Sequence, residues 1–179
     1  INSSTGVIAF ASAPDYETTT SYSATVTAGD GTNETTQSIT VNINNLNDNS
    51  PSFTSSATFS ADENQTAIGT IEATDVDGDT LTYSISGSDI TINSSTGVIT
   101  FASAPDYETT TSYSATVTVS DGSNTESQDI TVSINNLNDN DPLITSSSTF
   151  NNTENTTEVG TITATDADND TLTYSLSAV

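Results

Sequence analysis

Hydrophobic and polar residues alternate with a period of two along most of the chain. In residues 112–119 a tyrosine, an alanine and two valines alternate with serine and threonine, and residues 81–86 and 130–134 repeat the pattern. Successive side chains of a β-strand point to opposite faces, so each run predicts a strand with one buried and one solvated face. No run has the period of an amphipathic helix. The pattern therefore predicts an all-β protein.

Clusters of glycine, asparagine, aspartate and serine separate the alternating runs and predict the turns between strands. Short strands at this spacing are typical of an antiparallel β-sandwich of Greek-key topology, like that of immunoglobulin domains. In the central part of the chain we expect seven strands, over residues 58–61, 67–74, 81–86, 89–93, 97–101, 112–120 and 127–135.

The pattern recurs along the chain at a fixed interval. Residues 1–10 (INSSTGVIAF) return as residues 92–101 (INSSTGVITF), and residues 11–27 return unchanged as residues 102–118. The period of 91 residues (92 − 1) is too long for one turn of a solenoid but suits a small β-domain. The sequence thus predicts tandem seven-stranded sandwiches with a 91-residue repeat.

Proline marks the boundaries between the repeats. Pro51 and Pro142 each follow closely on an NLNDN segment, and proline interrupts a strand because it cannot donate a ladder hydrogen bond. Since the chain opens on Ile1 rather than on Met, we expect an interior piece of a longer protein. We expect the C-terminal half of one repeat in residues 1–50, a complete repeat in residues 51–141 and the N-terminal half of a further repeat in residues 142–179.

The charge of the chain is entirely negative, with 24 acidic residues, no basic residue and a net charge of −24. Such a chain repels nucleic acid and anionic membrane surfaces, and no segment is apolar enough to insert into a membrane. Without His, Lys, Arg or Cys there is no ordinary general base and no phosphate clamp, so we do not expect an enzyme. Low hydrophobicity with high charge is typical of disorder, but the regular strand pattern favours a fold whose acid is neutralised by cations.

Fourteen of the 24 acidic residues lie in five short motifs that recur with the repeat. Each motif falls at a predicted turn or repeat end, where a single aspartate would be ordinary turn chemistry. Five together concentrate hard oxygen ligands of the kind that Ca²⁺ prefers. The residues are Asp15, Glu17, Asp106 and Glu108 (PDYE), Asp48 and Asp139 (NLNDN), Glu63 (DENQ) with its counterpart Glu154, Asp75, Asp77, Asp166 and Asp168 (TDVD, TDAD), and Asp30 and Asp121 (each before Gly).

In their order along the repeat, these motifs resemble those of cadherin repeats, and more specifically those of bacterial cadherin-like repeats of large surface proteins. DENQ is similar to the early Glu motif, PDYE to the Asp-x-Glu motif and TDVD to the Asp-x-Asp motif. VSDG is similar to the late Asp motif, and NLNDN before proline to the linker. The resemblance covers the whole chain and implies Ca²⁺ between successive repeats, with about two to three ions per junction.

Carried over position by position, the resemblance implies two junctions within the chain. The first would use Asp15, Glu17, Asn45, Asn47, Asp48, Asn49, Asp75, Asp77 and Asp121. The second would use Glu63, Asp106, Glu108, Asn136, Asn138, Asp139, Asn140, Asp166 and Asp168. Asp30 and Glu154, which belong to the same motifs, complete the set of candidate metal ligands.

The linkers depart from the family at one position. The family's linker usually opens with Asp, where this chain has Asn45 and Asn136. An amide oxygen can ligate a cation but brings no charge, so we expect a lower affinity or fewer ions. Asp79 and Asp170 are either additional ligands or turn residues.

These features predict a calcium-rigidified structural stalk or fibre segment of a cell-surface adhesin, located outside the cell or in a secreted matrix. Its expected partners are calcium ions and neighbouring repeats or copies of itself. An alternative is a subunit of a self-assembling filament, in which residues 142–179 of one copy complete residues 1–50 of the next by strand donation. A less favoured alternative is an ice-binding module or another module that binds through exposed threonines.

Overall fold

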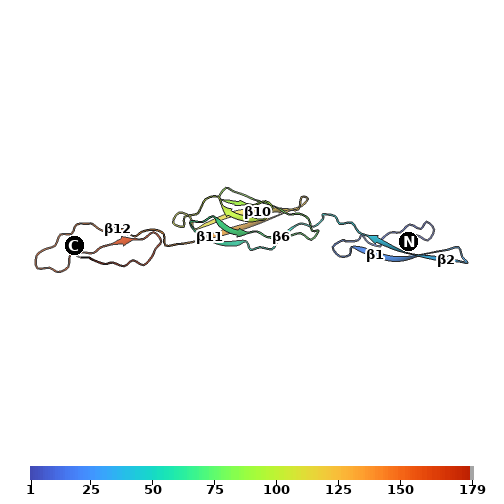
Figure 1. The fold of residues 1–179 in the computed structure, drawn as a ribbon, viewed down its shortest axis with the longest axis horizontal. Helices are drawn as coiled ribbons and strands as arrows, with labels where there is room; N and C mark the ends of the chain where they lie inside the picture. Colours follow the sequence, from blue (N-terminus) through green and yellow to red (C-terminus); the bar gives the residue numbers. More distant parts are fainter. Residues whose placement is uncertain (178–179) are drawn as a thin grey trace.

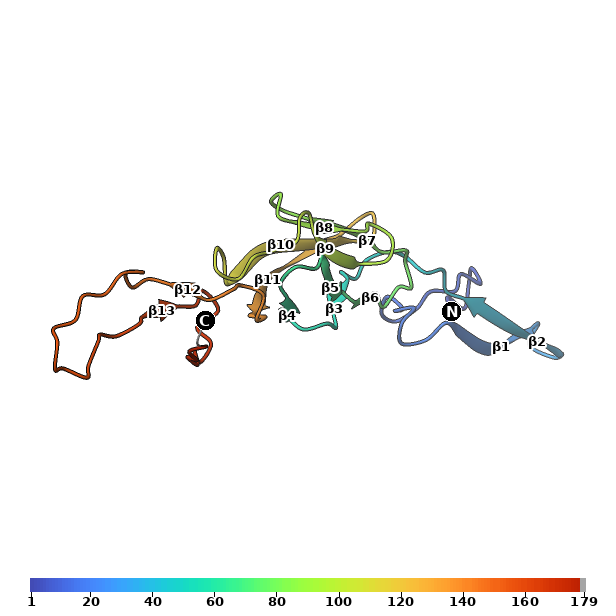
Figure 2. The same ribbon diagram turned by 60° about the vertical axis from the view of Figure 1, so that its left-hand side comes forward.

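The structure, a computed structural model, describes residues 1–177 and extends along one long axis (Figure 1). The N-terminal segment, residues 1–50, contains the hairpin β1 (Ser21–Gly29) and β2 (Glu34–Asn42). The C-terminal segment, residues 142–177, contains the short pair β12 (Leu143–Ile144) and β13 (Ala164–Thr165). Between them, residues 51–141 form a β-sandwich that we call the central sandwich (Figure 2).

The central sandwich consists of two layers. One layer is a four-stranded sheet in the order β4-β11-β10-β7, and the other contains the sheet β5-β9-β8 and the pair β3-β6. The strands are β3 (Ser52–Phe53), β4 (Thr58–Asp62), β5 (Ala67–Thr70), β6 (Ala73–Thr74), β7 (Thr82–Ile85), β8 (Ile90–Ile92), β9 (Val98–Phe101), β10 (Ser112–Ser120) and β11 (Thr125–Asn135).

The core lies between the two layers and is built from the alternating apolar residues. Ile99 of β9 faces Val117 of β10 and Val132 of β11 across the core, and all three have no exposed surface. Burying a branched aliphatic side chain of this size contributes about 1.5–3 kcal/mol. The prediction of an all-β sandwich is therefore confirmed, and the alternation of residues along β10 and β11 predicted the buried face correctly.

One of the predicted strands is wrong. The expected strand over residues 67–74 is split into β5 and β6, which pair with β9 and β3 respectively. The pairing changes partner after Ile71: its main-chain amide still donates to the carbonyl of Gly97 beside β9, whereas the carbonyl of Glu72 accepts from the amide of Thr54 beside β3. Gly97 has a φ of +70°, and a Cβ there would collide with the Ile71 carbonyl oxygen, so glycine is required where these segments meet.

The sandwich is also not antiparallel throughout. β4 pairs in parallel with β11, from Thr58 opposite Thr131 to Asp62 opposite Asn135. The reason is that the chain leaves one layer after β3, which pairs with β6, and crosses to the edge of the other layer at β4. This crossing brings the chain beside the last strand of the sandwich in the same direction.

The exposed face of the four-stranded sheet carries mainly serine and threonine, but not a regular threonine lattice. On β10 and β11 the outward pairs are Ser114 with Thr131, Thr116 with Asp129 and Thr118 with Ser127. The Thr118 and Ser127 hydroxyls hydrogen-bond each other at 2.9 Å. This irregular face gives no support to the ice-binding alternative.

Candidate metal centres

Four carboxylates meet where the central sandwich joins the C-terminal segment. Glu63, Glu108, Asp139 and Asp168 each place an oxygen within 4.8 Å of the others, and we call this set the C-terminal cluster. Glu63 directly follows β4, Glu108 lies in the loop before β10, Asp139 is in the linker after β11, and Asp168 follows β13. The cluster thus combines groups from the sandwich, the linker and the next segment.

Main-chain amides hold the two buried members of this cluster in place. Glu63, which is 2% exposed, accepts hydrogen bonds from the amides of Tyr107 at 2.8 Å and Leu137 at 2.7 Å. Asp168, which is 6% exposed, accepts from the amides of Asp139 at 3.1 Å and Asn140 at 2.9 Å. These bonds fix the linker to both neighbours and orient the carboxylates toward one another.

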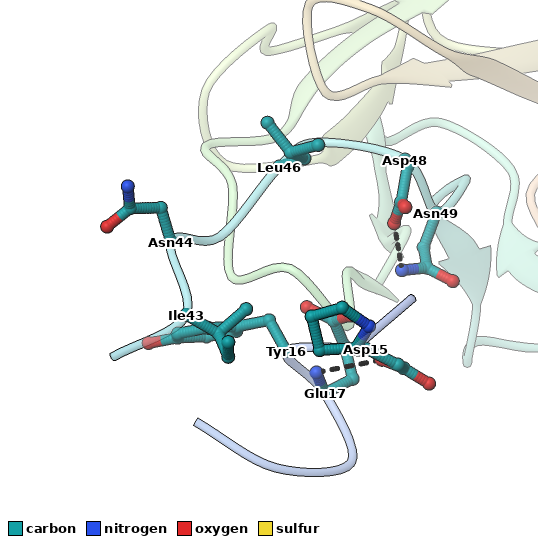
Figure 3. Close-up of a pocket in the computed structure, with 9 residues that line it drawn as sticks. Asp15, Tyr16, Glu17, Ile43, Asn44, Leu46, Asp48 and Asn49 are labelled. Atoms are coloured by element: carbon teal, nitrogen blue, oxygen red, sulfur yellow. Dashed lines mark hydrogen bonds between the residues drawn. The ribbon is translucent and has the colours of Figure 1, made fainter. Parts of the chain in front are cut away.

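The same arrangement recurs 91 positions earlier (Asp168 to Asp77). Glu17, Asp48 and Asp77 form the N-terminal cluster, again with oxygens within 4.8 Å of one another. Asp77 accepts from the amides of Asp48 at 3.1 Å and Asn49 at 2.8 Å, as Asp168 does from its own linker. Figure 3 shows Glu17, Asp48 and Asn49 around the pocket at this junction.

Each junction contains a second group of carboxylates on one loop. Asp75, Asp77 and Asp79 lie within this distance of one another, and so do Asp166, Asp168 and Asp170. Asp79 and Asp170, whose role the sequence left open, are therefore placed with the predicted ligands. One Asp75 carboxylate oxygen is buried without a hydrogen-bond partner. Burying an unpaired polar atom destabilises the folded state, and a bound cation would provide the missing partner.

Several predicted ligands lie outside these groups and stabilise their own turns. Asp15 accepts from the amide of Glu17 at 3.0 Å, Asp30 from the amide of Asn33 at 2.7 Å, and Asp106 from the Thr109 hydroxyl at 3.0 Å. Glu154 is exposed and belongs to none of the clusters found among the described residues. Asn138 is also exposed and lines a pocket beside Asp141, Asp166 and Asp170.

The first asparagine of each linker uses its amide nitrogen rather than its oxygen. Asn45 Nδ2 donates to the main-chain carbonyl of Asp77 at 2.7 Å, and Asn136 Nδ2 donates to that of Asp168 at 2.8 Å. A carboxylate at these positions could not donate such a bond. The departure from the family's Asp thus gives the junction a direct hydrogen bond.

Asn124, which the sequence reasoning missed, lies at the N-terminal junction. Its Nδ2 atom donates to Asn47 Oδ1 at 2.9 Å, to the carbonyl of Asn49 at 3.0 Å and to Asp121 Oδ2 at 3.0 Å. The residue recurs as Asn33, three positions after the Asp of the Asp-Gly motif in both repeats. That recurrence is the signal that could have identified it.

Hydrogen bonding and crowding shift the acid strength of these groups in opposite directions. The Asn49 amide lowers the pKa of Asp77, and the Asn140 side chain lowers that of Asp168. For Asp121, loss of hydration alone would raise the pKa, but bonds from the Asn124 and Ser123 amides outweigh it and lower it. Loss of hydration, aided by repulsion from neighbouring carboxylates, raises the pKa of Asp79.

Comparison with known proteins gives a consistent result. Residues 56–135 match the cadherin domain family. The match identifies a cadherin domain in the central sandwich. Human Protocadherin Fat 4 is 38% identical over an alignment of 130 positions, which covers 65% of this chain and 3% of that protein. The chain thus spans a small fraction of this relative's length.

Solved structures agree with the fold over most of the chain. The structure of a protocadherin gammaB7 EC3-6 cis-dimer superposes with a TM-score of 0.72 at 26% identity, covering 86% of this chain and 45% of that one. Mouse cadherin-23 EC22-24 superposes with a TM-score of 0.63 at 26% identity, covering 86% and 56%. The expectation of an extracellular, cadherin-like, tandem-repeat module is confirmed.

Two finer points follow from the family. Cadherin domains are adhesion modules rather than enzymes, and they bind Ca²⁺ between repeats. The relatives named here are animal proteins, so the comparisons do not support the closer resemblance to bacterial repeats. No helix among residues 1–177 is long and apolar enough to cross a membrane.

Proposed function

We propose that this chain is a segment of an extracellular stalk or fibre whose cadherin repeats are locked end to end by calcium. The repeats divide at the linkers, into residues 1–50, 51–141 and 142–179. The observation that carries the proposal is the C-terminal cluster, because four carboxylates from the sandwich, the linker and the next segment converge there. The chain contains no basic side chain that could neutralise them.

The chemistry of the two clusters suits calcium better than other common ions. Ca²⁺ takes six to eight oxygen ligands from carboxylates, carbonyls and amides, in flexible geometry. The N-terminal site would be held by Glu17, Asp48 and Asp77, and the C-terminal site by Glu63, Glu108, Asp139 and Asp168. The loop groups ending in Asp79 and Asp170 would supply further ligands, for about two to three ions per junction.

Bound calcium would restrain the angle between successive sandwiches. Each cluster takes ligands from both sides of a linker, so an ion bound there connects two modules and stiffens the hinge. A segment of this kind is suited to spacing an adhesive tip from the cell surface.

A calcium titration tests the proposal directly. We expect the melting temperature to rise by several degrees in saturating Ca²⁺, because a ligand that binds only the folded state stabilises it, and scattering should show a more extended chain. Asp139→Asn should lower the calcium-bound transition and have little effect in chelator. Asp89→Asn, which lies outside every cluster, is the matched control. Equal melting and equal dimensions with and without calcium would refute the proposal.

A second candidate function is self-assembly into a filament by exchange of segments between copies. The terminal segments expose apolar residues whose equivalents are buried in the central sandwich. Ile8 is 52% exposed, whereas its equivalent Ile99 is 0% exposed. Ile162 is 43% exposed, whereas its equivalent Ile71 is 1% exposed. Residues 142–177 of a second copy carry the strands that would cover residues 1–50. Sedimentation at increasing concentration tests this candidate, since head-to-tail chains must lengthen with concentration and an invariant monomer would exclude them.

A further inference from the structure

Two polar side chains lie side by side where β4 and β11 end. Asp62 is the last residue of β4 and Asn135 the last of β11, and the parallel pairing of the strands places them opposite each other. Asn135 Nδ2 donates to Asp62 Oδ1 at 2.9 Å. Asp62 belongs to none of the carboxylate clusters found among residues 1–177. This carboxylate therefore has a partner of its own and is not one of the predicted ligands.

The bond lies directly before the buried glutamate of the C-terminal cluster. Side chains alternate along a strand, so Asp62 is exposed whereas Glu63, which follows it, is buried. The main-chain amide of Glu63 donates to the carbonyl of Asn135 at 3.2 Å, and its carboxylate accepts from the amide of Leu137 at 2.7 Å. Three successive hydrogen bonds thus connect the end of β4 to the residues that lead into the linker.

The position of β4 in the sheet explains why its end needs this bond. β4 has five residues and is an edge strand of the sheet β4-β11-β10-β7. An edge strand is held on one side only, so its end opens more readily than that of a central strand. Opening would carry Glu63 away from the amides of Tyr107 and Leu137, and hence from the other carboxylates of the cluster.

We propose that Asp62 is a positioning residue for the C-terminal cluster. By accepting from Asn135, it keeps the end of β4 paired with β11 and holds the Glu63 carboxylate in the cluster. It acts through its hydrogen bond, not as a ligand and not through its charge. That the cluster binds calcium rests on the proposed function, whereas the effect of Asp62 on the position of Glu63 does not.

The next repeat keeps the glutamate but not the aspartate before it. Glu63 recurs as Glu154, 91 positions later (154 − 63), whereas the position of Asp62 is occupied by Thr153. A threonine has no carboxylate and a shorter side chain, so it cannot reproduce the bond to Asn135 in the same form. The residue that holds the glutamate thus differs between repeats, although the glutamate itself does not.

Three variants separate the hydrogen bond of Asp62 from its charge. Asp62→Ala removes both, Asp62→Asn removes the charge but keeps an oxygen that accepts from Asn135, and Asp89→Asn removes one charge outside every cluster. Hydrogen exchange of the Glu63 and Leu137 amides in chelator reports the end of β4. We expect exchange about threefold to tenfold faster in Asp62→Ala, from the loss of one hydrogen bond, and wild-type exchange in the other two.

The donor of the bond provides an independent test. Asn135→Ala should speed exchange as much as Asp62→Ala, and the double variant should be no faster than either single variant, because all three lack the same interaction. Titration calorimetry should show calcium affinity about threefold to tenfold weaker in Asp62→Ala, since Glu63 then leaves the cluster more often. Asp62→Asn should bind calcium as the Asp89→Asn control does.

The outcomes separate this inference from the proposed function. Unchanged exchange in Asp62→Ala overturns the inference, and so do equal effects of Asp62→Ala and Asp62→Asn, which would assign the effect to charge. Faster exchange with unchanged calcium affinity overturns the link to the cluster. If the wild-type chain does not bind calcium, the proposed function fails, whereas faster exchange in Asp62→Ala still supports the positioning of Glu63. Asn135→Ala keeps the experiment decisive if Asp62→Ala misfolds.

Discussion

The N-terminal segment, residues 1–50, and residues 92–141 of the central sandwich have nearly the same sequence but different surroundings. Ile99 and Phe101 of β9 are 0% and 3% exposed, whereas their equivalents Ile8 and Phe10 are 52% and 43% exposed. The local aromatic contact survives in both, with ring centroids 5.1 Å apart for Phe101 and Tyr113 and 4.9 Å for the N-terminal pair. Neighbouring strands thus come together from the local sequence, but burial requires the opposite layer.

The largest expected effect contrasts the two isoleucines. Ile99→Ala removes a fully buried side chain and should lower the free energy of unfolding of the central sandwich by about 2–5 kcal/mol. Ile8→Ala changes an exposed side chain and should cost less than about 1 kcal/mol. Urea unfolding followed by circular dichroism measures both. Equal losses would mean that the N-terminal segment is packed against something in solution.

The next contrast concerns Glu63 and Glu154, which occupy the same position in successive repeats. Glu63→Gln leaves one of the amides of Tyr107 and Leu137 without an acceptor and should cost about 1.5–3 kcal/mol, the value of a hydrogen bond to a charged group. Glu154→Gln, at an exposed position, should have little effect on stability. Glu63→Gln should also weaken calcium binding, as measured by titration calorimetry. If Glu63→Gln has the stability and the calcium affinity of the wild type, Glu63 is not part of the calcium site.

A third contrast uses two glycines in the same backbone conformation. Gly97 and Gly6 have φ values of +70° and +73°, so alanine is strained at both. A Cβ would collide with Ile71 at Gly97, whereas a Cβ at Gly6 would meet nothing within 4 Å among residues 1–177. We expect Gly97→Ala to be about 1–3 kcal/mol more destabilising than Gly6→Ala. Equal effects in urea unfolding would show that the approach of Ile71 is not needed for the fold.

The smallest expected effect is the dependence of stability on pH in the calcium-free chain. The raised pKa of Asp79 and of Glu108, each due first to loss of hydration, means that the folded state binds their protons more tightly. Stability should therefore rise as the pH falls from neutral through these pKa values. Asp77 and Asp168 have pKa values below the ordinary 3.8, so their contribution is lost as the pH falls further. Urea unfolding over a pH series should show a maximum, whereas a steady decline from neutral pH would contradict the assigned shifts.

Repetition and alternation in the sequence were enough to predict much of this molecule. The period of two in residues 112–119 identified β10 and its buried face, because side-chain direction in a strand follows from local geometry. The resemblance of PDYE, NLNDN and TDVD to cadherin motifs implied which carboxylates would lie at the junctions. Glu108, Asp139 and Asp168 each place an oxygen within 4.8 Å of the others, and their binding of calcium stays a prediction.

Only the tertiary structure decided how distant segments meet. The parallel pairing of β4 with β11 and the break at Ile71 depend on which partner each strand meets, and neither residue pattern differs from that of an ordinary strand. Asn124 contacts Asn47, which is 77 positions away; the recurrence of this residue as Asn33 marks it as part of the repeat but does not identify its partner. The alternation of residues within one strand determines which side chains are buried, because side-chain direction follows from the local backbone. The partners across a junction are determined by how the two layers of the sandwich pack, and no single segment of the sequence contains both layers.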